Sequence, residues 1–97
     1  MTAVTLAMAM FAKNLQTQFH VHTSSGAAVE LELIELSEGP ANPGHEIFSL
    51  TFRGPIEAFL GQGMVSMSHD AIGDFELFIV PVAQTSDGFL YEAVFNR

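Results

Sequence analysis

The stretch that constrains the fold most is residues 46–82, which reads as three strands separated by glycine and proline. In its last segment, residues 74–81, Phe75, Leu77 and Ile79 lie on one face of the strand and Phe78 and Val80 on the other, so both faces carry apolar residues. A strand of this kind needs cover on both sides, from its own core and from a helix or another subunit. We therefore expect the rest of the chain to be organised around this strand.

Alternating apolar and polar residues predict the other strands. Short alternating runs bounded by Gly, Pro, Ser and Asp are typical of half-buried strands. We predict six strands, at residues 16–23, 28–36, 46–53, 64–69, 74–81 and 89–96. Ile34 breaks the alternation of the second strand, which predicts a bulge or a twist that returns Leu36 to the core. We expect the fifth strand to end at Pro81, because proline cannot donate to a continuing ladder.

The opening segment is apolar, but it lacks the features of a signal peptide or a membrane span. It has no basic first region, and Lys13 and Asn14 interrupt its apolar run well before the roughly 20 residues that a spanning helix needs. Apolar residues recur near helical spacing after Thr5, a residue type that caps helices. We predict a short helix over residues 5–14 that covers one face of the sheet, and a cytoplasmic protein.

Six strands with local connections and one N-terminal helix place the chain in the mainly β class. We predict a small six-stranded antiparallel barrel or rolled meander, because closing the sheet removes exposed edges. A two-layer β-sandwich is the alternative. A chain of 97 residues forms one domain, residues 1–97, and can bury one modest core.

The acidic, weakly charged composition limits the partners. Three Lys plus Arg against eleven Asp plus Glu give a formal net charge of −8, which repels phosphate backbones and anionic lipids. We expect neither nucleic acid nor membrane as a partner. Charged residues are only 14% of the chain, below the usual quarter or so, so the surface is either unusually rich in small polar residues or partly apolar. A partly apolar surface predicts a homo-oligomer or an assembly partner, contacted through Phe78, Val80, Leu90 and Val94.

Several blocks of the chain have a recognisable spacing. They are FSLTFRGP at 48–55, Gln62 with Gly63, Ser68 with His69 followed by IGDFELFIVPV at 72–82, and YEAVFNR at 91–97. Together with the spacing of Leu6, Phe11, Leu15 and Phe19, they resemble a family of short bacterial proteins known as a domain of unknown function. Members of that family are often encoded near tail-collar-like, microcystin-dependent-type proteins related to phage tails. The resemblance implies an assembly or adaptor role, with incorporation into a tail-like particle.

Two histidines are the candidates for a metal site. His20 and His22 project from one strand face about 7 Å apart, a geometry that metal sites use. The residues after His22 do not supply the Glu that a cupin-like site needs. The other pairs that could complete a site are His45 with Glu46 and His69 with Asp70. The alternative interpretation is an exposed polar strand face, and we expect neither a bound metal nor a cofactor.

A second set combines Arg53, Glu76 and Glu92. Both carboxylates share strand faces with apolar residues, where a lone charge is costly unless it is paired. We predict that Arg53, one of three basic residues, pairs with one or both as a structural ion cluster. The functional alternative is an acid–base carboxylate pair, which requires a raised pKa on one member.

The motifs of common enzyme classes are missing from the sequence. No serine lies in a G-x-S-x-G elbow, and the GQG at 61–63 is too short for a phosphate loop and lacks the following Lys. We predict a non-enzymatic structural or interaction domain that acts by self-association or by docking into a larger assembly, related to phage tails. A small-ligand or metal-binding β-barrel is the alternative, and an enzyme of unknown reaction comes third.

Overall fold

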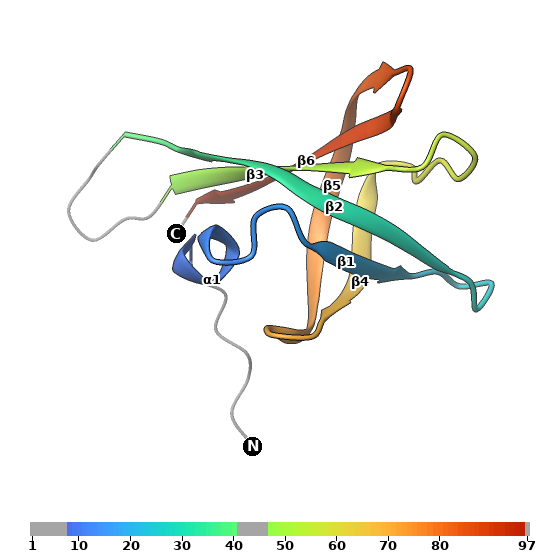
Figure 1. Ribbon diagram of the computed structural model, residues 1–97, viewed down its shortest axis with the longest axis horizontal. Coiled ribbons are helices and arrows are strands. Elements are labelled where there is room, and N and C mark those ends of the chain that lie inside the picture. The colour runs from blue at the N-terminus through green and yellow to red at the C-terminus, as the bar shows by residue number, and fades with distance from the viewer. Residues whose placement is uncertain (1–7, 41–46, 97) are drawn as a thin grey trace.

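The computed structural model describes residues 8–40 and 47–96, which form a closed barrel of six antiparallel strands with one short helix (Figure 1). The elements in chain order are α1 (Met8–Ala12), β1 (Gln18–His22), β2 (Ala28–Glu38), β3 (Ile47–Gly54), β4 (Gly63–His69), β5 (Gly73–Thr85) and β6 (Gly88–Asn96). Around the barrel the order is β1-β2-β3-β6-β5-β4. The predicted mainly β barrel is confirmed, in place of the two-layer sandwich.

Apolar side chains from all six strands fill the barrel interior. Inward and outward positions alternate, as the burial of every second residue from Ile47 to Gly54 in β3 illustrates. The large side chains with less than 2% exposure are Tyr91, Phe11, Phe19, Phe48, Phe52, Leu31, Leu33, Leu50, Met67, Ile79 and Val21. Each buried aliphatic or aromatic side chain contributes about 1.5–3 kcal/mol of burial free energy, so this core holds the fold together.

The helix α1 closes one end of the barrel. Its Phe11 is fully buried, and ring centroids of Phe19, Phe48, Phe75 and Phe95 lie 5.6–6.2 Å from its own. We expected a helix over residues 5–14 on one face of the sheet. A closed sheet leaves no inner face open, so the helix fills an end instead (Figure 1). Residues 5–7 lie outside the described part of the chain.

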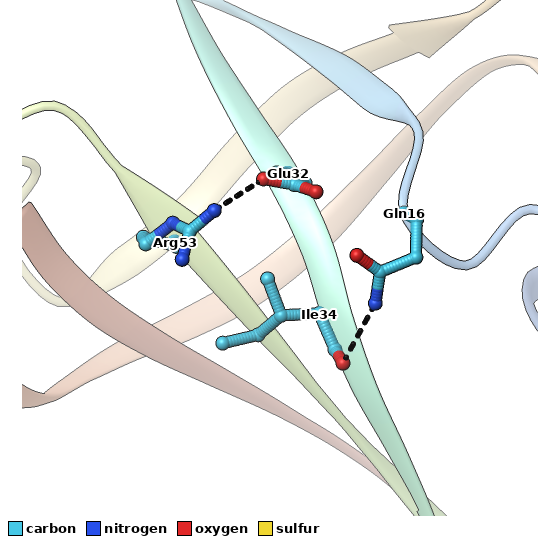
Figure 2. A network of polar contacts seen from close by, with 4 residues as sticks. All are labelled: Gln16, Glu32, Ile34 and Arg53. Atoms are coloured by element: carbon cyan, nitrogen blue, oxygen red, sulfur yellow. Dashed lines mark hydrogen bonds and ion pairs between the residues drawn. The ribbon is translucent and has the colours of Figure 1, made fainter. Parts of the chain in front are cut away.

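The segment after α1 supports the bulge predicted at Ile34. The register between β2 and β3 shifts between Leu33 and Glu35, which confirms that bulge, and Leu36 packs against the core beyond it. Gln16, at φ 67, donates its backbone N–H to the Leu33 oxygen at 2.7 Å. Its side-chain amide lies 3.5 Å from the Ile34 oxygen (Figure 2), so the carbonyls of the bulge have partners.

Strand β5 is longer than predicted. We expected it to end at Pro81, but it continues to Thr85, and the register against β6 shifts between Pro81 and Ala83. A bulge is one of the positions in a sheet that tolerates proline, because the ladder hydrogen bond is interrupted there in any case.

Within residues 8–40 and 47–96, no helix is long and apolar enough to cross a membrane.

Candidate functional site

Large apolar side chains lie exposed on the outside of β4, β5 and β6. Phe78 is 48% exposed and Met64, directly opposite it in the β4–β5 ladder, is 63% exposed. Val94 on β6 is 65% exposed, whereas Val80 and Leu90 are half-buried. We call the set of Met64, Phe78, Val80, Leu90 and Val94 the outer apolar face. Four of these residues were predicted contact residues, and the sequence reasoning missed Met64, whose partner Phe78 could be identified only from the register.

The other side of β5 explains why both faces of this strand are apolar. Phe75, Leu77 and Ile79 alternate with the outer residues and point into the barrel, with exposures of 9% or less. The helix α1 packs at the barrel end and leaves Phe78 accessible. Among the residues that the structure describes, no element covers the outer apolar face.

Two carboxylates lie on the same side of the sheet as the outer apolar face. Glu76 is exposed two residues before Phe78, and Glu92 is opposite Val80 in the β5–β6 ladder and half-buried. Neither carboxylate has an ion pair with another described residue. Because the strands form a closed barrel, these side chains point to the solvent and do not require a buried counter-charge.

Arg53 is in an ion pair, but with a partner other than the predicted ones. Its Nη2 donates to Oε1 of Glu32 at 2.6 Å (Figure 2), and the register of β2 and β3 places the two residues directly opposite each other. Glu92 lies opposite Thr51, one diagonal away from Arg53, and Glu76 is on β5, which is not adjacent to β3. The prediction of Glu76 or Glu92 as the partner is therefore wrong.

A surface hollow of about 450 Å³ surrounds this ion pair. Its lining includes Gln18, Pro55 and Asp87 beside Arg53 and Glu32, so it lies outside the barrel and carries charges of both signs. The carboxylates outnumber the single guanidinium, and Glu32 already occupies part of the hydrogen-bonding capacity of Arg53.

His20 and His22 point outward from β1, as predicted, and each has a different partner. Nδ1 of His20 lies 3.4 Å from Oε1 of Glu30, and Nε2 of His22 lies 2.9 Å from Oγ of Ser68. In the described part of the chain, no three His, Cys, Asp or Glu side chains come together in a way that could hold a metal ion. His45 and Glu46, the other predicted pair, lie outside the described residues.

His69 forms a hydrogen-bonded network that sequence reasoning did not anticipate. The ring is 8% exposed and its centroid lies 4.4 Å from that of Phe19. Nδ1 accepts the backbone N–H of Ala71 at 3.0 Å, so in the neutral ring Nε2 carries the proton and donates to Oγ1 of Thr17 at 2.9 Å. The Thr17 hydroxyl in turn donates to the Asn14 oxygen at 2.6 Å. This network links the end of β4 to the turn that follows α1.

The environment of His69 favours its neutral form. Burial lowers the pKa of His69 from its usual 6.5, the negative charge of Asp70 acts in the opposite direction, and His20 adds to the lowering. The alternation of residues 64–69, which puts His69 on the same face as Met67, is the signal from which its burial could have been predicted.

Comparison with known proteins identifies a family without assigning an activity. Residues 6–95 match the family model described as "Domain of unknown function (DUF6916)". No curated protein and no solved structure shows significant similarity to the chain.

Proposed function

The chain belongs to the DUF6916 family, a domain of unknown function, and we propose that it is a non-enzymatic interaction domain that buries its outer apolar face against another protein chain. The observation that carries the proposal is the exposure of Phe78, Met64 and Val94 on strands whose other face is fully used by the core. Exposed apolar patches of this kind typically mark contact surfaces of soluble proteins.

Phe78 has the properties of an interface anchor. It is an aromatic side chain on a regular strand, with Met64 beside it, so it is presented rigidly and has an adaptable apolar neighbour. Aromatic residues near the centre of an interface carry a large share of binding energy. Burying it fully would contribute up to about 3 kcal/mol, less the part that is already buried.

The outer apolar face is covered either by a second copy of the chain, through self-association, or by a component of a larger assembly into which the domain docks. The assembly implied by the resemblance is a particle related to phage tails, with the domain made in the cytoplasm. Both statements rest on the sequence alone and stay predictions. The barrel interior is filled by side chains, which favours an outer surface as the place of contact over an internal ligand.

The solution mass tests self-association. Light scattering on a size-exclusion column over a range of concentrations gives the mass of the wild type and of the Phe78→Ser variant. A defined oligomer that becomes monomeric in Phe78→Ser supports a contact through the outer apolar face. An oligomer of unchanged stability in both Phe78→Ser and Val94→Ser contradicts the proposal, because the chain would then associate through another surface.

A matched variant controls for general surface effects. Thr51→Ser changes an outward-facing residue of β3, outside the outer apolar face, without adding an apolar or charged group. Its mass and melting temperature are expected to equal those of the wild type. A change of oligomeric state in this control would place the contact on β3 instead.

A further inference from the structure

Among the described residues, the charged side chains beside the outer apolar face that have no ion pair are both acidic, whereas Arg53, opposite Leu90 in the β3–β6 ladder, is paired with Glu32. Glu76 lies two residues from Phe78 on the same face of β5, and Glu92 lies opposite Val80. In residues 8–40 and 47–96 the basic side chains are Lys13, which follows α1 at the barrel end, and Arg53, which is paired with Glu32. The face therefore combines apolar side chains with two carboxylates, Glu76 beside Phe78 on β5 and Glu92 between Leu90 and Val94 on β6.

A second copy of the chain is poorly suited to this face. In a two-fold symmetric contact the same patch lies on both sides, so Glu76 and Glu92 of both copies would be enclosed in one interface, and the outer apolar face has no Lys or Arg to pair with them. Each copy also carries a formal net charge of −8. Juxtaposed like charges oppose binding, most strongly where water is excluded.

This inference rests on the proposed function. We propose that the partner of the outer apolar face is a protein segment that carries both apolar and basic side chains. Its apolar side chains cover Phe78 and Met64, and its Lys or Arg side chains pair with Glu76 and Glu92. A carboxylate that accepts hydrogen bonds from a guanidinium or an ammonium group gains more than one left to water at the edge of an apolar contact. Complementary charge also sets the orientation and speeds the encounter.

The spacing of the face limits the sequence of that segment. Residues two apart on a strand are separated by about 7 Å, so Glu76 and Phe78 require a cationic and an apolar group at about that spacing. Residues i and i+2 of an extended segment, or i and i+4 of a helix, meet this requirement. A segment with Lys or Arg at such a spacing from Leu, Val or Phe fits the face.

Three synthetic peptides test this chemistry with the full-length chain. The first alternates Lys with Leu, Val and Phe, the second has Glu in place of each Lys, and the third keeps Lys but has Ser in place of each apolar residue. Fluorescence anisotropy of labelled peptides gives the affinities. We expect the first peptide to bind about tenfold or more tightly than either of the others, and its affinity to fall as salt is raised.

Paired variants locate the binding. Replacing both Glu76 and Glu92 by Gln is expected to weaken the basic peptide about tenfold and to flatten its salt dependence, and Phe78→Ser is expected to weaken it at least as much. The matched control replaces Glu30 on β2 and Glu57 after β3, two exposed carboxylates away from the outer apolar face, by Gln. Since all of these side chains are at least partly exposed, circular dichroism should show the wild-type fold in each variant.

Each contrary result has a distinct meaning. Equal binding of the basic and acidic peptides, both dependent on Phe78, overturns the basic partner but retains the contact face. An equal loss in the control pair overturns the location, because the peptide would then respond to net charge alone. Absence of binding by the basic peptide overturns the inference. A Phe78-dependent oligomer found alongside that absence assigns the face to a second copy, and an oligomer that persists in both Phe78→Ser and Val94→Ser contradicts the proposed function as well.

Discussion

The two faces of strand β5 have similar compositions and different surroundings. Phe75, Leu77 and Ile79 point into the barrel and are 9% exposed or less, whereas Phe78 on the opposite face is 48% exposed. Both faces contribute to the apolar pattern of the sequence, the inner one with Phe75, Leu77 and Ile79 and the outer one with Phe78 and Val80. This difference in exposure shows that a run of apolar residues indicates how much apolar surface requires burial. It does not indicate whether the same chain or another chain covers that surface.

Of the substitutions that test this difference between the two faces, one on the inner face is expected to change the free energy of unfolding most. Leu77→Ala removes a buried side chain and leaves a cavity, so we expect the free energy of unfolding to fall by about 2–5 kcal/mol in urea denaturation. Val94→Ala, which truncates an exposed side chain on the outer face, is the control and should change it by less than about 0.5 kcal/mol. Similar losses in the two variants would mean that the inner and outer faces are not distinct.

At the β5–β6 hairpin, the backbone at Gly88 lies close to the backbone at Gly54, and this contact tests the packing of the inner side of the barrel without changing an apolar side chain. Gly88 has φ 148, and an added Cβ would collide with the carbonyl oxygen of Gly54. We expect Gly88→Ala to lower the free energy of unfolding by about 1–3 kcal/mol. Gly61→Ala is the control, because nothing lies within 4 Å of a Cβ there. An unchanged Gly88→Ala variant would contradict this packing of the hairpin against the end of β3.

His69 extends the comparison to a polar residue on an inward-facing position. Its pKa in the folded state is lowered below the usual 6.5 by burial, so below pH 6.5 the unfolded chain binds more protons than the folded one. The stability that neutral His69 provides is complete above pH 6.5 and is lost as the pH falls toward its folded-state pKa. His69→Gln should remove this part of the pH dependence in denaturation measured across that window.

The control for His69 is an exposed histidine on the outside of the barrel. His22→Gln leaves the hydrogen-bonded network of His69 intact, because His22 lies exposed on β1 and bonds the Ser68 hydroxyl, so the pH dependence that His69 provides should remain. A wild-type slope below pH 6.5 in His69→Gln would show that the buried network does not sense protonation.

The smallest effect is expected for the ion pair on the outer surface. Arg53 and Glu32 side chains are 39% and 21% exposed, so the pair is partly screened by water. Arg53→Met should change the free energy of unfolding by at most about 1 kcal/mol. A double-mutant cycle with Glu32→Gln isolates the interaction itself. A coupling well above that value would mean that this pair behaves as a buried one.

The fold could be predicted from local patterns, because alternation reports strand faces one residue at a time. All six strands and the bulge at Ile34 follow from such patterns. The extension of β5 past Pro81 could not be predicted in this way, since a bulge is defined by the partner strand.

The contacts at the candidate site depended on which strands are neighbours. Arg53 pairs with Glu32 because β2 lies beside β3, a fact of the strand order around the barrel rather than of the local sequence. The Thr17 bond to His69 joins residues 52 positions apart in the chain. Alternation grouped Phe78 with Val80 and Leu90 with Val94, whereas the closed barrel was needed to show that these residues point outward. The partner that covers them stays a prediction.

The measurement that tests the central claim most directly is the free energy of unfolding of Phe78→Ala, at a concentration where light scattering shows a monomer. If the remaining cover for Phe78 comes from another chain, this variant should lose at most about 1.5 kcal/mol, the part of its burial made within one chain, while Leu77→Ala next to it loses about 2–5 kcal/mol. A loss for Phe78→Ala equal to that of Leu77→Ala would contradict the account, because the outer face would then belong to the folding core.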